Sequence, residues 1–314
     1  MDRNVWFERR AVDALRGLDD RAGQGTILFA HSYSARAIFR HAKSRGWTTV
    51  LGQIDPGEAH FQIVRRVSEE LQEYGGTPGA PPPAYFEAWH EECTLADWIV
   101  VNSEWSREAL RRSGVAGGNV RVIPLAYEPE AIGPVAPREY PPAFTAARPL
   151  RVLFVGHVSV AKGMPALLGA ITQMAHAPLT LRVVGESAMA VPPRFRDHPA
   201  IAWVGPVSRS DVMRHYRECD VLVFPSHSDG FGMAQVEAQA WRLPIVASRC
   251  CGHVVQDGVN GILLPEVSAG AITAALTRLV ESPRLLAEFS RHAGGAQAVG
   301  VDALSVELLR LEHA

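Results

Sequence analysis

The sequence is poor in the features that mark metal-binding, nucleic-acid-binding and membrane-spanning proteins. Its 314 residues include only four cysteines (Cys93, Cys219, Cys250 and Cys251), and no CxxC pair is present to chelate zinc. We therefore expect reduced, buried thiols rather than a metal site. Lysine plus arginine totals 31 and aspartate plus glutamate 33, so the net charge of -2 lacks the basic excess of a typical nucleic-acid binder.

Long apolar runs are also missing. No stretch approaches the roughly 18 apolar residues that a membrane-spanning helix needs. The N-terminal "MDRNVWFERR" is charged and has no apolar core, so it does not read as a signal peptide. These absences predict a cytoplasmic protein, and they leave contact with a membrane surface open.

What remains is an ordinary globular composition, 47% hydrophobic and 20% charged, long enough for two domains. A proline-rich stretch at 127–150 reads as a linker, and another at 75–84 reads as a surface loop. We place a first domain with its linker at 1–147, a second domain at 148–297 and a C-terminal helix at 298–314.

Short apolar runs alternate with helical patterns in both domains. Continuous apolar strands between helices indicate parallel sheets covered by helices, which predicts an α/β protein with Rossmann-like, doubly wound domains. The predicted strands are 26–30, 48–54, 98–102 and 120–124 in the first domain, and 151–155, 179–184, 201–204, 220–224, 244–247 and 261–264 in the second.

The stretch "SHSDGFGMAQVEAQAWRLPIVAS" (226–248) carries the most chemical information. Gly230 and Gly232 let the backbone approach a ligand closely, and the helix that follows offers unpaired N–H groups and a positive dipole end. Such a helix end is a phosphate site. Lys162, in the loop after the strand 151–155, would add a positive charge to the same phosphates.

Two carboxylates flank this helix start. Glu237, about two turns into the helix, could accept hydrogen bonds from both hydroxyls of a ribose. Asp229 precedes the helix and could hold hydroxyls of a sugar beyond the phosphates. Ribose, diphosphate and sugar together describe a nucleotide sugar. Each signal also has a plain alternative: Asp229 capping the helix, Glu237 facing solvent, and Lys162 in an ordinary loop.

These motifs resemble those of the retaining glycosyltransferases of family 4, which have the GT-B fold of two Rossmann-like domains facing a cleft. "DGFGMAQVEAQAWRLP" is similar to the family's Glu-x7-Glu signature, and "GHVSVAKG" to its loop after the first strand of the donor domain. "ADWIVVNSEWSREALRRSGV", "ECDVLVFPS" and "VVQDGVNGILLP" also match. The resemblance runs from about residue 26 to 292.

The resemblance implies roles for individual residues. Glu237 would bind ribose, Asp229 the donor sugar and Lys162 the diphosphate. The backbone of Gly232, Met233 and Ala234 would hold the distal phosphate. The implied donor-binding set is Gly156, His157, Lys162, Gly185, Glu186, Gly205, Pro206, Val207, Asp229, Gly230, Phe231, Gly232, Met233, Ala234 and Glu237.

Two positions depart from the family pattern. His157 stands where the family has an arginine on the diphosphate, and a neutral imidazole provides less charge and no bidentate fork. Asp229 stands where the family has glutamate, which is longer by one methylene. Both changes bear on donor affinity and on the choice of sugar.

The first domain should hold the acceptor. Its candidates follow strand ends: His31 and Ser32, then Asp55, then Ser103. His60 is the best match to the family's histidine near the donor sugar, so the predicted catalytic set is His60, Asp229 and Lys162. The usual first strand and its glycine-rich loop have no counterpart here, so the first domain looks shortened, with a sheet edge that a homodimer would cover.

The sequence therefore predicts an enzyme, a retaining glycosyltransferase of hexosyltransferase type, that moves a sugar from a nucleotide sugar to a hydroxyl of a glycan, a lipid or a small molecule. No metal cofactor is expected, because no DxD-type carboxylate pair follows a strand. The alternative is a protein that binds a nucleotide sugar or a partner without turnover. A nucleotide-sugar epimerase is a third reading, but its first-domain carboxylates cannot be placed.

Overall fold

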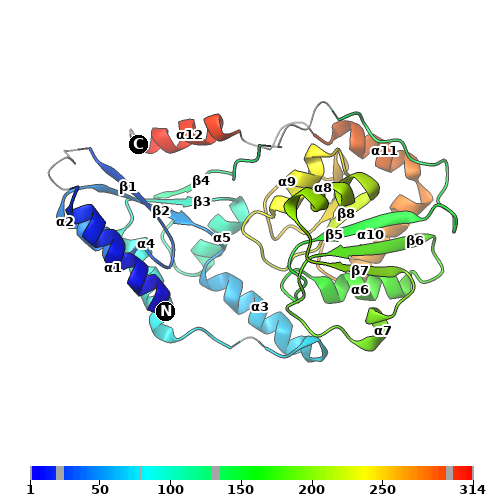
Figure 1. Cartoon of the computed structure of the whole chain (residues 1–314), viewed down its shortest axis with the longest axis horizontal. Helices are drawn as coiled ribbons and strands as arrows, with labels where there is room; N and C mark the ends of the chain where they lie inside the picture. Colours follow the sequence, from blue (N-terminus) through cyan, green and yellow to red (C-terminus); the bar gives the residue numbers. More distant parts are fainter. Residues whose placement is uncertain (1, 19–24, 78, 129–134, 295–299, 313–314) are drawn as a thin grey trace. The chain divides into compact units, whose positions relative to one another are not determined.

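A computed structural model shows an α/β protein with two compact units (Figure 1). Unit 1 comprises Met1–Gln62, Gly79–Leu125 and Val301–Ala314, and unit 2 comprises Ile63–Pro78 and Ala126–Gly300. All ten predicted strands are present, each within two residues of its expected ends. The structure describes residues 2–18, 25–77, 79–128, 135–294 and 300–312.

Unit 1 contains a four-stranded parallel sheet in the order β1-β2-β3-β4. Because this order runs in one direction, right-handed crossovers place the connecting helices on one face. Its strands are β1 (Ile27–His31), β2 (Thr48–Gln53), β3 (Trp98–Val101) and β4 (Val120–Val122). Its helices are α1 (Asp2–Arg16), α2 (Arg36–Ser44), α4 (Pro83–Leu95), α5 (Glu104–Arg112) and α12 (Val301–Leu309), the last followed by the 3-10 turn η2 (Arg310–Glu312).

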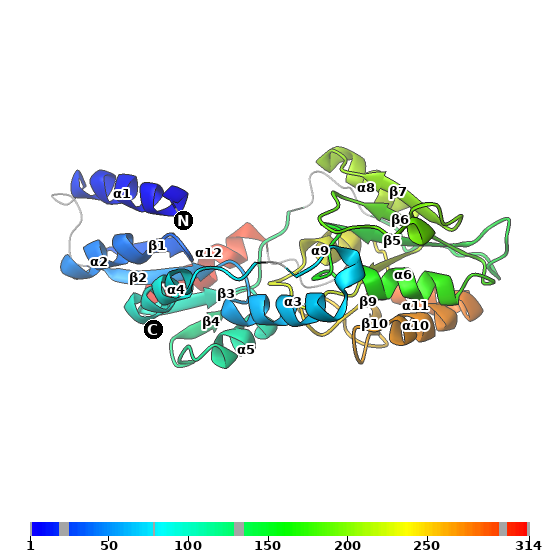
Figure 2. The same cartoon turned by 90° about the horizontal axis from the view of Figure 1, so that it is seen from below.

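The two faces of this sheet are covered differently. Helices α2, α4 and α5 pack on Leu51 and Ile99, and α1 lies alongside α2 (Figure 2). The segment formed by α12 and η2 packs on Val50 and Val100 of the other face. The C-terminal helix is therefore part of unit 1 rather than a separate element.

Unit 2 is doubly wound. Its six parallel strands lie in the order β10-β9-β8-β5-β6-β7, which reverses direction between β5 and β8. Ligands of such sheets bind beyond the carboxyl ends of the strands at this reversal, because the loops there diverge. The strands are β5 (Leu150–Val155), β6 (Leu179–Val184), β7 (Ile201–Gly205), β8 (Val221–Phe224), β9 (Ile245–Ala247) and β10 (Gly261–Leu263).

Helices cover both faces of the unit 2 sheet. One face carries α6, α10 and α11, and the other carries α8 and α9. Helix α3 begins in unit 1 and ends in unit 2. Within the described ranges, no helix combines the length and apolar character needed to cross a membrane. The remaining bounds are α3 (Glu58–Glu70), η1 (Gln72–Tyr74), α6 (Met164–Gln173), α7 (Pro193–Arg196), α8 (Arg209–Glu218), α9 (Met233–Ala240), α10 (Ala269–Glu281) and α11 (Pro283–His292).

The described part of the predicted linker is docked on unit 2. Residues 129–134 lie outside the described ranges, but Arg138 is held by five hydrogen bonds. Its guanidinium donates to the carbonyl of Trp241 at 3.0 Å, to that of Cys219 at 2.7 Å and to that of Tyr216. A cation thus ties together the C-terminal ends of α8 and α9, where helix dipoles favour positive charge.

Replacing Arg138 with methionine is expected to lower the free energy of unfolding by about 2–3 kcal/mol, because these part-buried carbonyls lose a charged donor. Urea denaturation followed by circular dichroism measures the change. Arg284→Met, at an exposed position on α11, is the matched control and should stay within about 0.5 kcal/mol of the wild type. Equal effects of the two substitutions would contradict this role for Arg138.

Candidate functional site

The loops after β5 and β8 carry the charged residues that the sequence singled out. Lys162 follows β5 and Asp229 follows β8, the two strands at which the sheet order reverses. The Lys162 ammonium contacts the Asp229 carboxylate, and it also lies 5.4 Å from the ring centroid of Phe224. Both side chains are largely buried, so this ion pair is shielded from solvent more than a surface pair would be.

Helix α9 begins directly after this loop, at Gly232. The cap residue has φ 84° and makes no side-chain capping hydrogen bond, so Asp229 is not the helix cap that it could have been. A Cβ at Gly232 would lie 2.7 Å from the ring of Phe224. Only glycine suits this position, both for its left-handed backbone and for its close contact. The start of α9 therefore carries no side-chain cap.

Two further glycines allow the loops of the site to approach one another. A Cβ at Gly163 would lie 1.9 Å from the carbonyl oxygen of Pro225, and one at Gly185 would lie 1.9 Å from that of Gly156. Gly163 has φ 69°, and it starts α6 immediately after Lys162. The conformation of this glycine therefore helps to fix where the Lys162 backbone runs.

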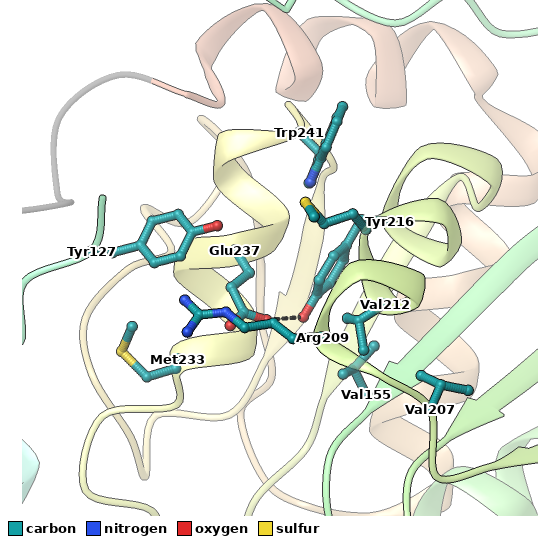
Figure 3. Close-up of a pocket in the computed structure, with 10 residues that line it drawn as sticks. Tyr127, Val155, Val207, Arg209, Val212, Tyr216, Met233, Glu237 and Trp241 are labelled. Carbon is teal, nitrogen blue, oxygen red and sulfur yellow. Dashed lines mark hydrogen bonds between the residues drawn. The ribbon is translucent and has the colours of Figure 1, made fainter. Parts of the chain in front are cut away.

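Glu237 projects from the middle of α9 into a cavity of about 480 Å³ (Figure 3). Tyr216 of α8 donates its hydroxyl to Glu237 Oε2 at 2.7 Å. Burial, reinforced by the Glu237 carboxylate, raises the pKa of Tyr216 well above its ordinary value, so the phenol keeps its proton and remains a donor. One carboxylate oxygen is thus held by the protein, and the orientation of the other is fixed.

The remaining walls of the cavity are mostly apolar and aromatic. Arg209 and Tyr127 also line the cavity around Glu237 (Figure 3). The indole Nε1 of Trp241 is buried and has no hydrogen-bond partner in the described structure. The volume and the few convergent polar groups suit a nucleoside-sized ligand. The full lining is Tyr127, Val155, Val207, Arg209, Val212, Met213, Tyr216, Met233, Glu237 and Trp241.

The predicted donor-binding residues fall into two groups. Val207, Met233 and Glu237 line the cavity. The others lie at or near the carboxyl ends of the same sheet. Gly205 ends β7, and Ala234 lies in the first turn of α9. His157 and Glu186 are exposed in the loops after β5 and β6. The residues in loops are Gly156, His157, Lys162, Gly185, Glu186, Pro206, Asp229, Gly230, Phe231 and Gly232.

Sequence reasoning missed the contribution of α8. Four of its side chains, at positions 209, 212, 213 and 216, line the cavity. Their i, i+3, i+4, i+7 spacing marks one face of a helix, and this pattern was visible in the sequence. Trp241, one turn beyond Glu237, was equally accessible to such reasoning.

The acceptor-side candidates of unit 1 mostly have local structural partners. Ser103 caps α5 by accepting a hydrogen bond from Ser106 N at 3.1 Å. Asp55 accepts from the Tyr33 hydroxyl at 2.7 Å and from Gly57 N at 2.8 Å, which fixes the turn after β2. Ser32 is buried and accepts from Ile54 N.

Two further candidates in unit 1 are histidines. His31 is exposed at the end of β1, with its ring 5.4 Å from that of Phe29. His60 lies in the first turn of α3, 5.6 Å from the ring of Phe61. Nothing in this geometry assigns either histidine to a reaction, and the role of His60 stays a prediction.

Sequence reasoning did not identify the buried Glu92 on α4. Its carboxylate accepts hydrogen bonds from the backbone N–H groups of Tyr33 at 2.7 Å, Ala35 at 2.9 Å and Arg36 at 3.2 Å, around the start of α2. Burial outweighs these bonds and raises the pKa of Glu92 to about 7. The adjoining residue of α1, Glu8, adds to the increase.

This raised pKa predicts a stability that falls as the pH rises. The unfolded carboxyl loses its proton near pH 4.5 and the folded one near pH 7, so between these values the unfolded state binds fewer protons. The free energy of unfolding should drop by about 3 kcal/mol across this window. Glu92→Gln removes the titration, although it also loses one hydrogen bond at every pH.

Urea denaturation at pH 5, 6, 7 and 8 measures the unfolding free energy of Glu92→Gln and of the wild type. As the pH rises, the variant is expected to become more stable relative to the wild type. Glu91→Gln, at the partly exposed neighbouring position that pairs with Arg40, is the control for surface charge. A difference that does not change with pH would show that Glu92 titrates normally.

No group of three or more histidine, cysteine, aspartate or glutamate side chains in the described part of the chain is placed to hold a metal ion. The four thiols are unpaired with one another, and burial raises the pKa of Cys251 to about 12. Cys251 therefore stays protonated, and it accepts a hydrogen bond from Gln235.

Comparisons with known proteins agree with this arrangement. Residues 149–282 match the family model "Glycosyl transferases group 1". A D-inositol 3-phosphate glycosyltransferase of Kineococcus radiotolerans is 29% identical over 252 residues, which cover 70% of this chain and 58% of that protein. D-inositol 3-phosphate glycosyltransferase 2 of Catenulispora acidiphila is 32% identical over 160 residues, which cover 45% of this chain and 38% of the relative. The chain thus spans less than two thirds of the length of either relative.

Solved structures show the same fold. Anabaena HepE in complex with UDP and glucose superimposes with a TM-score of 0.70 at 16% identity, covering 97% of this chain and 80% of HepE. Sucrose-phosphate synthase of Thermosynechococcus elongatus gives a TM-score of 0.70 at 21% identity, covering 96% and 76%. At these identities the likeness establishes the fold alone.

Proposed function

We propose that the protein transfers a sugar from a nucleoside diphosphate sugar to a hydroxyl acceptor, because residues 149–282 match the family model "Glycosyl transferases group 1" and the chain has the GT-B fold that the sequence predicts. The observation that carries this proposal is the site in unit 2. There, three features lie near the point at which the sheet order reverses: Glu237 in a nucleoside-sized cavity, the uncapped start of α9, and Lys162. Each part of a nucleotide sugar finds a group of matching chemistry.

In this proposal Glu237 accepts hydrogen bonds from the ribose hydroxyls through the oxygen that Tyr216 leaves available. Lys162 and the N–H groups at the start of α9 take the charge of the diphosphate, so no metal ion is required. Transfer is then expected to persist in excess EDTA. Asp229, already beside Lys162, is proposed to orient hydroxyls of the donor sugar.

We further propose that the transfer retains the anomeric configuration. The acceptor oxygen would attack the anomeric carbon on the face from which the diphosphate departs, and a departing phosphate oxygen would take the acceptor proton. The protein would contribute position and stabilisation of the leaving charge. Unit 1 is proposed to hold the acceptor at the carboxyl ends of β1 and β2, with His60 as its catalytic candidate.

A second function, binding without turnover, is favoured by two observations. The sheet of unit 1 has four strands against six in unit 2, and three acceptor-side candidates already have partners within unit 1. A non-catalytic protein would keep the donor site and lose only the transfer.

Thermal unfolding in the presence of UDP, GDP and ADP and their common sugars tests both readings. A ligand at 100 times its Kd should add about 2.7 kcal/mol of stability. The stabilising donor is then incubated with sugar and lipid acceptors, and the anomer of the product is read by NMR. Retained configuration supports the enzyme, and binding without any product or hydrolysis supports the binding protein. Stabilisation by none of these nucleotides would reject both.

A further inference from the structure

Helix α1 presents two large aromatic side chains to solvent. Trp6 is 65% exposed and Phe7 is 50% exposed. The opposite side of the helix is fastened to unit 1, since Asn4 Nδ2 donates to the Tyr33 carbonyl at 2.8 Å and Val12 and Leu15 pack near α2. These contacts hold α1 in an orientation that leaves Trp6 and Phe7 exposed.

Positive charge accompanies these aromatic residues. Arg3, Trp6, Phe7 and Arg10 follow the i, i+3, i+4, i+7 spacing of one helix face. The exposed Arg3, Arg9 and Arg10 form no ion pair with the residues that the structure describes. One acidic neighbour, Glu8, is turned inward and buried.

Another acidic residue, Asp13, lies near the end of the helix and pairs with Arg16 at 3.3 Å. The chain as a whole carries a net charge of -2, so this basic face is a local concentration. The outward face of α1, defined here as Arg3, Trp6, Phe7, Arg9 and Arg10, therefore suits a partner that is negatively charged and has an apolar layer beneath the charge.

The size of this face argues against a second protein. Two aromatic side chains offer about 300–500 Å² of contact area, whereas a stable protein interface buries about 800 Å² on each partner. Aromatic rings rest at the boundary between headgroups and acyl chains, and arginines alongside them reach lipid phosphates. A helix lying flat on a bilayer uses this combination.

We propose that the outward face of α1 docks the protein on an anionic lipid surface, with Trp6 and Phe7 inserted at headgroup depth and Arg3, Arg9 and Arg10 on the lipid phosphates. Docking does not require glycosyl transfer, so this inference can be tested independently of the proposed function. It would place the protein at a surface where lipid-linked molecules are available.

Co-flotation of the full chain with vesicles tests the proposal. Vesicles of phosphatidylcholine with 30% phosphatidylglycerol should bind the protein at low salt, and binding should weaken as salt rises. Arg3→Gln with Arg10→Gln should reduce the partition coefficient about 25-fold, since each arginine near an anionic surface contributes about fivefold. Trp6→Ser with Phe7→Ser should reduce it at least tenfold. Pure phosphatidylcholine should bind the wild type far more weakly.

The matched control is Val306→Ser with Leu309→Ser on α12, whose two side chains are also well exposed but lie beside the acidic Glu307 rather than a basic face. This variant should float with anionic vesicles as the wild type does. Circular dichroism and nucleotide affinity should match the wild type in every variant. The proposal is overturned if the wild type does not bind anionic vesicles, if the control loses binding as much as the α1 variants, or if the α1 face supports self-association instead.

Discussion

Replacing Glu237 with alanine is expected to weaken binding of a nucleoside diphosphate by about 1–3 kcal/mol, because the ribose would lose a charged acceptor. The structure adds a second consequence. Tyr216 is buried and donates to Glu237, so the alanine variant leaves this hydroxyl without an acceptor and costs stability as well. Binding must therefore be measured by calorimetry well below the unfolding temperature of the variant.

Two further substitutions separate these consequences. Glu237→Gln keeps an oxygen for Tyr216 and removes the charge, so it should weaken nucleotide binding with little loss of stability. Tyr216→Phe leaves the carboxylate in place and should have the smaller effect on affinity. If Glu237→Ala binds every nucleotide as tightly as the wild type, the ribose assignment fails.

The second large effect is expected at Lys162. Its removal should lower turnover by about 10²–10³-fold, the usual result of losing one group that stabilises a developing negative charge. It should also weaken diphosphate binding, because Asp229 is left as an uncompensated carboxylate beside the phosphates. Initial rates with saturating donor, together with calorimetry, measure the two effects.

The pair Lys162–Asp229 allows a sharper test. Asp229→Ala should reduce turnover more than nucleotide affinity, because its proposed contact is with the sugar. The double variant should bind the nucleotide more tightly than Lys162→Ala alone, since the repulsive carboxylate is gone. Additive losses of nucleotide affinity in the double variant would contradict the proposed roles of Lys162 on the diphosphate and Asp229 on the donor sugar.

The sequence predicted the strands well because strands leave local patterns of apolar residues. Apolar runs between helical segments identify parallel strands, and the topology then brings Lys162 and Asp229 to adjacent strand ends. Glu237, which the sequence singled out for ribose, lines the cavity, and its role stays a prediction. It left open whether Asp229 was a helix cap, and the backbone of Gly232 answers this.

Contacts between distant residues could not be predicted in this way. Tyr216 reaches Glu237 from another helix, and Glu92 caps α2 from a position more than fifty residues away. Neither pair leaves a periodic or compositional trace in one sequence. The sequence also did not show that α3 begins in one unit and ends in the other, because its helical pattern continues across the boundary.

The hydrogen bonds from Arg138 to the ends of α8 and α9 couple the segment around residues 138–140 to ligand binding in the cavity. Tyr216 and Trp241 line the cavity with their side chains, and their carbonyls hold the Arg138 guanidinium. A nucleotide that rigidifies these helices should therefore slow amide hydrogen exchange around residues 138–140, and by reciprocity an ordered segment tightens nucleotide binding. An environment-sensitive fluorophore attached at the exposed Glu139 would then report ligand binding without touching the cavity.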